Sequence, residues 1–113
     1  MNMICVAYFT GAVGQSIGMF YFGNGVISGV DVGGLKYDGN LSRQIDGSFE
    51  GTVTLKIPAG TQLITGLAAG SSDHEMASHI RLPKDFATTG EVIRIDTPAG
   101  AVSARFELLR EVP

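Results

Sequence analysis

The chain of 113 residues has little cysteine, little charge and no long apolar run. Its one cysteine, Cys5, excludes an internal disulfide and so indicates a reducing compartment. No apolar run approaches the ~20 residues that cross a bilayer as a helix. The amino terminus has no Lys or Arg before Thr10-Gly11 interrupts its apolar residues, which is a poor match to a signal peptide. We therefore expect a cytoplasmic protein with no membrane segment.

Positive charge is also scarce. The eight Lys and Arg residues are scattered without a run of three, and the net charge is −3. Because nucleic-acid binding depends on neutralising phosphates with a basic surface, we expect no nucleic-acid partner. The hydrophobic fraction of 44% excludes a disordered chain, and the length predicts a single domain over residues 1–113.

Glycine, by contrast, is abundant. The sixteen glycines are about twice the usual share of ~7% and separate short apolar runs. No stretch of ten residues keeps a helical apolar period, so we expect short strands joined by tight turns. The runs predict strands over 4–9, 16–23, 26–32, 35–41, 51–57, 62–69, 91–96 and 101–109. Asn24-Gly25 predicts a hairpin turn. Residues 70–77 are polar and loop-like, 79–82 form a short apolar piece, and 83–86 predict a helical turn or bend.

Two of these strands alternate apolar and polar residues with a period of two, which predicts one buried face and one wet face. The inward positions are Val53, Leu55, Ile57, Val102, Ala104, Phe106 and Leu108. About eight such strands predict an all-β fold, a small eight-stranded antiparallel β-barrel, although a two-sheet sandwich fits the same strand count. A barrel of this size is either filled by side chains or holds one small ligand. A ligand cavity would be lined by Val53, Leu55, Val102, Ala104 and Phe106.

The residues that could support chemistry form no recognisable catalytic or metal motif. His74 and His79 are five residues apart, whereas the H-E-x-x-H zinc motif needs four, so we expect an exposed loop and no metal. Cys5 lies in an apolar strand, where a thiol is usually inert and packs as a small hydrophobic group.

Glycines at 11–14 and 23–25 precede no helix, so they predict turns rather than a phosphate-binding loop. Asp31, Asp38 and Asp46 follow strands or lie in turns, where Asp usually bonds its own backbone. Nothing in the sequence sets their separation from one another or from Glu50. We therefore expect no cofactor and no catalytic residues, and hence no enzyme.

Met19-Phe20-Tyr21-Phe22 places large apolar side chains on both faces of one strand. Such a strand either exposes a patch to a second subunit or is covered by the amino-terminal segment or residues 70–77. We expect a homodimer with its contact at Phe20 and Phe22.

Several short motifs occur in a familiar order: Gly18 followed by Met-Phe-Tyr-Phe, then Asn24-Gly25-Val-Ile-Ser-Gly-Val-Asp31, then Tyr37-Asp-Gly39. An alternating strand at 51–57, an apolar piece that leads into Leu82-Pro83-Lys84, and two final strands ending in Phe106-Glu-Leu108 follow in turn. In this order the chain resembles the GrlR-like family of negative regulators, first known from a type III secretion locus of enteric bacteria.

The resemblance implies a lipocalin-like barrel that pairs as a homodimer and binds a transcriptional regulator protein through a surface loop. That loop corresponds here to Ser42, Arg43, Gln44, Ile45 and Asp46, where one acid and one base replace the acidic run of the founding members. Two functions are therefore expected: a non-enzymatic regulator that binds a protein, or a barrel that binds an apolar ligand such as a lipid or fatty acid.

Overall fold

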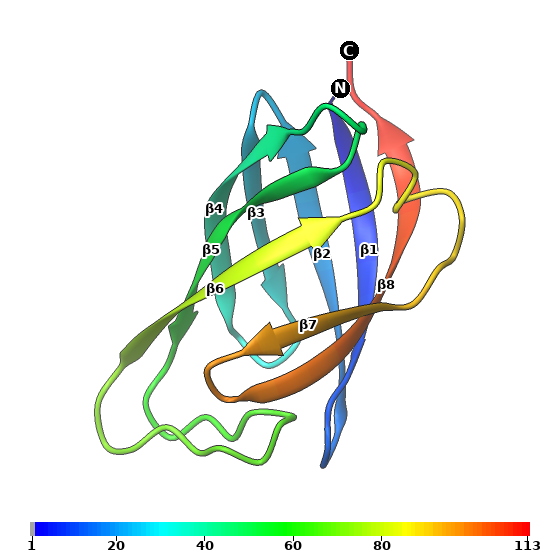
Figure 1. Cartoon of the computed structure of the whole chain (residues 1–113). Coiled ribbons are helices and arrows are strands. Elements are labelled where there is room, and N and C mark those ends of the chain that lie inside the picture. Colours follow the sequence, from blue (N-terminus) through cyan, green and yellow to red (C-terminus); the bar gives the residue numbers. More distant parts are fainter. Residues whose placement is uncertain (1) are drawn as a thin grey trace.

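The computed structural model describes residues 2–113 as eight β-strands joined by turns and loops (Figure 1). The strands are β1 (Met3–Thr10), β2 (Gln15–Gly23), β3 (Val26–Asp31), β4 (Lys36–Arg43), β5 (Phe49–Ile57), β6 (His74–Leu82), β7 (Ile93–Thr97) and β8 (Gly100–Glu111). Within this part of the chain there is no helix long and apolar enough to span a membrane. The prediction of an all-β, eight-stranded antiparallel barrel is confirmed.

All eight strands belong to one sheet with the order β6-β5-β4-β3-β2-β1-β8-β7, and every adjacent pair is antiparallel. The first strand, β1, pairs with the last, β8, and Figure 1 shows the two side by side along the wall of the barrel. The sheet curls until its edge strands β6 and β7 are in contact, which nearly closes the barrel. A single continuous sheet excludes the two-sheet sandwich.

The predicted hairpin at Asn24-Gly25 is confirmed. Asn24 has a φ of 53° and Gly25 a φ of 75°, between β2 and β3. A type I′ turn needs positive φ at both central residues, and it matches the twist of the two strands that it joins. This turn sets the register in which Phe22 faces Ile27.

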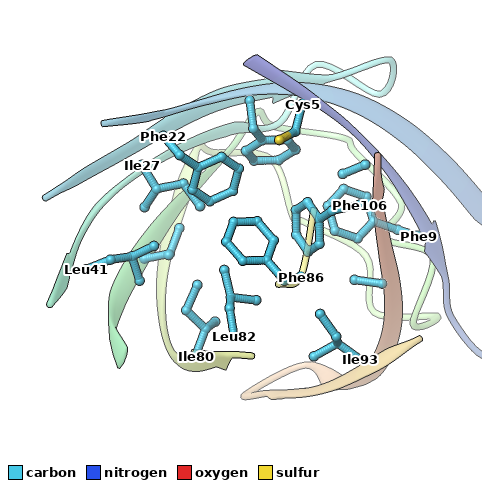
Figure 2. Close-up of a cluster of buried hydrophobic side chains, with 14 of the residues drawn as sticks. Cys5, Phe9, Phe22, Ile27, Leu41, Ile80, Leu82, Phe86, Ile93 and Phe106 are labelled. Atoms are coloured by element: carbon cyan, nitrogen blue, oxygen red, sulfur yellow. The ribbon is translucent and has the colours of Figure 1, made fainter. Parts of the chain in front are cut away.

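The predicted inward faces of β5 and β8 are also confirmed. Val53, Leu55, Ile57, Ala104 and Phe106 are buried, and the half-buried Val102 and Leu108 pack against them. Figure 2 shows Phe86 in the middle of this core. Phe86 is 1% exposed and lies in the predicted turn after β6, where its amide N–H donates to the carbonyl of Pro83.

Phe20 and Phe22 do not form an outer contact surface, so that prediction was wrong. They are 3% and 4% exposed and point into the barrel, whereas Met19 is 49% exposed on the outer face. Both faces of this strand are apolar, so its pattern alone did not determine which face is buried. The pairing with β1 and β3 determines it.

The segments between β5 and β7 also differ from the prediction. Residues 62–69 form a loop with one isolated bridge, because Gly66 has a φ of 101° and its N–H donates to the carbonyl of Leu63. Residues 74–77, expected in a loop, begin β6 instead. The inward face of β6 includes the polar Ser78, which interrupts the alternation of apolar and polar residues expected of a strand. The backbone of β6 is hydrogen-bonded to β5.

Candidate functional site

The two ends of the barrel are filled differently. At one end, Phe86 packs against Phe22 and Phe106 with ring centroids 5.0 and 5.4 Å apart. At the other end, where the β1–β2, β3–β4 and β5–β6 loops meet, there is a cavity of about 270 Å³. This is close to the lower end of the roughly 300–1,000 Å³ typical of ligand pockets. The cavity is the candidate binding site.

Four of the five predicted cavity residues line it: Val53, Leu55, Val102 and Phe106. Ala104 does not, although it is buried. It pairs with Phe9 of β1 and Ile93 of β7 and borders a separate, more open hollow on the side of the barrel. The alternation of β8 correctly predicted that Ala104 points inward, but not how far along the barrel axis the cavity extends.

The cavity wall also contains one carboxylate, Asp31, which is only 8% exposed. Its Oδ1 accepts hydrogen bonds from the backbone N–H groups of Gly33 and Leu35, at 2.9 and 3.1 Å. Its Oδ2 accepts a hydrogen bond of 2.8 Å from the hydroxyl of Tyr37. Asp31 therefore accepts hydrogen bonds from the backbone of its own turn, as predicted. It also accepts one from Tyr37, a second residue of the cavity wall.

Tyr37 lies on the inward face of β4 beside Asp31. Burial, and then the negative charge and hydrogen bond of Asp31, raise the pKa of its phenol far above the usual value. Its ring stacks on Phe9 with centroids 6.0 Å apart, and it meets Phe20 edge-on at 4.9 Å. Tyr37 is thus a fixed, protonated hydrogen-bond donor to Asp31.

The Asp31–Tyr37 pair is not predicted by the sequence patterns. The available signal was weak: an aspartate at the end of one strand and a tyrosine six residues later, across a tight turn. The hydroxyl of Tyr37 reaches the carboxylate of Asp31 only because Tyr37, half-buried in β4, points into the barrel.

Among the further hydroxyl-bearing residues that line the same cavity are Ser16, Thr65 and Ser78. The hydroxyl of each is buried and forms no hydrogen bond with any part of the chain between residues 2 and 113. Buried polar groups usually have partners, and those that do not need an explanation. Polar contact with a ligand in the cavity would provide one once these side chains rotate towards it, because their oxygens are covered.

The predicted partner-binding loop lies on the surface at the other end of β4. Ser42 and Arg43 end that strand, while Gln44, Ile45 and Asp46 form the turn to β5. The turn is held by backbone hydrogen bonds from Gln44 to Ser48 and from Gly47 to Gln44, at 2.7 and 2.9 Å. Ile45 is fully exposed at its tip.

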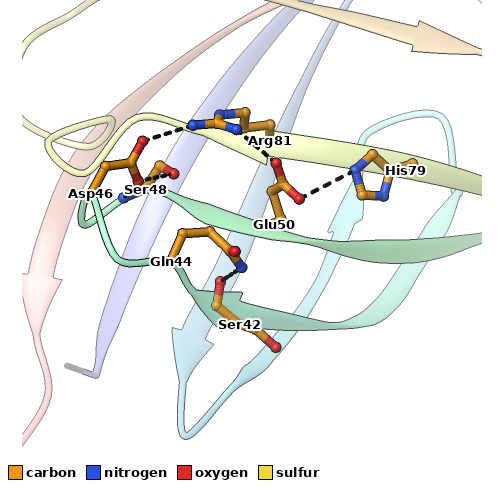
Figure 3. A network of polar contacts seen from close by, with 7 residues as sticks. All are labelled: Ser42, Gln44, Asp46, Ser48, Glu50, His79 and Arg81. Carbon is orange, nitrogen blue, oxygen red and sulfur yellow. Dashed lines mark hydrogen bonds and ion pairs between the residues drawn. The ribbon is translucent and has the colours of Figure 1, made fainter.

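A mixed-charge cluster adjoins this loop (Figure 3). Arg81 of β6 contacts Asp46 and Glu50 at 2.8 Å each. Hydrogen bonds from the hydroxyl and amide of Ser48, together with the charge of Arg81, lower the pKa of Asp46. A guanidinium that pairs with two exposed or half-exposed carboxylates is a surface ion-pair network.

His74 and His79 both lie in β6 and are exposed, rather than in a loop as expected. Residues an odd number apart on a strand point to opposite faces, so these two rings cannot converge on one ion. Within residues 2–113 no group of three or more His, Cys, Asp or Glu side chains is arranged to hold a metal. The absence of a metal stays a prediction for metal analysis of the purified protein.

Cys5 is fully buried in β1. Burial raises its pKa to about 11, so the thiol is protonated at neutral pH and unsuited to be a nucleophile. This agrees with the expectation that Cys5 packs as a small hydrophobic residue.

The fold and site together define an antiparallel barrel that is packed at one end and has a small, mostly apolar cavity at the other. No family model, no curated protein and no solved structure matches the chain. The resemblance to the GrlR-like family therefore stays a prediction from its sequence motifs.

Proposed function

We propose that this protein is a non-enzymatic, cytoplasmic binding barrel that holds a small, largely apolar ligand in its cavity. The observation that supports this most directly is the cavity itself, about 270 Å³ and lined mainly by aliphatic and aromatic side chains. Apolar surface removed from water contributes roughly 25 cal/mol per Å², so a ligand that fills this space gains binding energy from the walls alone.

The test is a calorimetric titration of the purified protein with 1-octanol, which measures the binding affinity. Val102→Phe places a large ring in the cavity, whereas Ser103→Phe places the same ring on the exposed neighbouring position of β8. We expect Val102→Phe to weaken octanol binding by on the order of tenfold or more and Ser103→Phe to leave it nearly unchanged. Circular dichroism establishes that both variants fold. Equal affinity in both variants would contradict the assigned cavity.

A second proposed function is regulation by protein binding, as in the GrlR-like negative regulators. The observation in its favour is Ile45, a fully exposed apolar residue at the tip of a hydrogen-bonded turn. The corresponding partner is a transcriptional regulator, and the first to test is one encoded beside this protein. Ile45→Asp should abolish binding of that purified regulator, while Val13→Asp, on the exposed β1–β2 loop, should not. Equal binding of the regulator by the two variants would exclude the Ile45 loop as its binding site.

We also propose that the protein forms a homodimer, through the outer face of β1, β2 and β3. Apolar side chains stand next to one another there, because Met19 pairs with Val30 and Tyr8 pairs with Ile17. All four are at least 36% exposed. A twofold contact would bury the same patch on both copies.

A further inference from the structure

We propose that the ligand of the cavity is an organic cation, an amine with a small apolar body, and that Asp31 is its counter-ion. This inference rests on the proposed ligand-binding function and names the chemical class of the ligand. It differs from the initial expectation of a lipid or fatty acid.

The first argument is charge. Asp31 is the one ionic side chain in the wall of the cavity, and among the described residues no Lys, Arg or His lines it. Its carboxylate also forms no salt bridge with any side chain in residues 2–113. A buried charge needs hydrogen bonds or an ionic partner, and Asp31 has three hydrogen bonds but no ionic partner. A ligand cation would complete the pairing.

The second argument is the aromatic wall. Phe9, Phe20 and Tyr37 form one cluster that lines the cavity, and Tyr37 is hydrogen-bonded to Asp31. The π-systems of aromatic rings attract cations within about 6 Å of the ring centroid, and sites that bind ammonium groups commonly combine several rings. A carboxylate beside an aromatic cluster therefore favours a positive head group.

The third argument comes from the unpaired hydroxyls of Ser16, Thr65 and Ser78, each with lone pairs that accept an N–H donor. Ser78 is only 3% exposed. Hydroxyls would serve an anion equally well, so they do not decide the sign of the ligand charge. Asp31 does, because a ligand carboxylate would place a second negative charge in the same small cavity, and like charges there repel strongly.

The experiment compares three probes with the same alkyl chain, octylamine, 1-octanol and octanoate, by calorimetry at pH 7. An alkylamine has a pKa near that of lysine, about 10.4, and is protonated at this pH. We expect octylammonium to bind on the order of tenfold more tightly than octanol, and octanoate to bind more weakly still. If octanol and octanoate bind as tightly as the amine, the cavity binds ligands but the cation inference is wrong. If none of the three binds, the proposed ligand-binding function itself fails.

Asp31→Asn tests the residue, because the amide keeps the shape and one acceptor oxygen but removes the charge. We expect its preference for octylammonium over octanol to disappear, while Asp46→Asn, at the other end of the barrel, keeps it. A folded Asp31→Asn protein that still prefers the amine would overturn the role of Asp31. If that variant does not fold, the three probes on the wild type still decide the inference.

Discussion

Inward side chains fill one end of the barrel and leave a cavity at the other. Phe22 and Phe86 occupy the filled end, whereas Val53 and Val102 line the cavity. Rings also line the cavity, Phe9, Phe20 and Tyr37 among them, but they leave the space between the walls open there. Single substitutions should therefore have different effects at the two ends.

Leu55 and Thr54 are neighbours on β5 that point to opposite faces. Leu55 is buried and Thr54 is on the outer face, half-exposed. Replacing Leu55 with Ala should lower the free energy of unfolding by roughly 2–5 kcal/mol, at the lower end if the adjacent cavity relaxes. Thr54→Ala should change it by only about 0.5 kcal/mol. Urea unfolding followed by circular dichroism measures both, and equally mild effects would contradict the assigned facing.

The thiol of Cys5 should be unreactive in the folded protein. Its pKa is raised from 9.0 to about 11 by burial, so the unfolded chain loses this proton before the folded one does. The contribution of this pKa difference to the free energy of unfolding is complete below pH 9 and is lost as the pH rises towards 11. Iodoacetamide should modify Cys5 slowly at pH 8 and rapidly after addition of urea. Fast modification of the folded protein would show that Cys5 is accessible.

At the scale of strands, two glycines allow Phe20 to lie inside the barrel. Gly29 of β3 pairs directly with Phe20 of β2, and a methyl group at Gly29 would overlap the Phe20 ring. Gly18, two residues before Phe20, is similarly close to it, since a Cβ there would lie 3.0 Å from a ring carbon. The glycines thus leave room for a ring that lies flat against the sheet, and their absence would force it to another rotamer.

Gly29→Ala should therefore destabilise the protein by about 1–3 kcal/mol through overpacking. The matched control is Ser28→Ala, the preceding residue of β3, which is exposed and should be nearly neutral. Thermal unfolding compares the two. A Gly29→Ala protein as stable as the control would show that Phe20 does not need this space.

At the scale of the whole molecule, the outer face of β1–β3 should mediate self-association. Light scattering at tens of micromolar should show a dimer, and Met19→Ser together with Val30→Ser should produce monomers with unchanged circular dichroism. A monomer for the wild type would exclude the dimer. Phe20→Ser and Phe22→Ser should instead cause loss of folded structure, because both rings belong to the core.

The sequence by itself determined the all-β class, the Asn24-Gly25 hairpin and the inward faces of β5 and β8. These depend on local rules: which residues tolerate positive φ, and a side-chain direction that alternates along a strand. It also predicted most of the cavity wall, because Val53, Leu55, Val102 and Phe106 follow from that alternation.

Only the tertiary structure decided the facing of β2, the strand over 74–82 and the Asp31–Tyr37 pair. In β2 both faces are apolar, so the partner strands select the buried one. In β6 the inward-facing Ser78 interrupts the alternating apolar pattern that would predict a strand. The segment is a strand because its backbone pairs with β5. Asp31 and Tyr37 meet because the turn between β3 and β4 folds back at Gly33 and Gly34, bringing a strand end beside an inward side chain. Each of these depends on contacts between segments, which local sequence patterns do not specify.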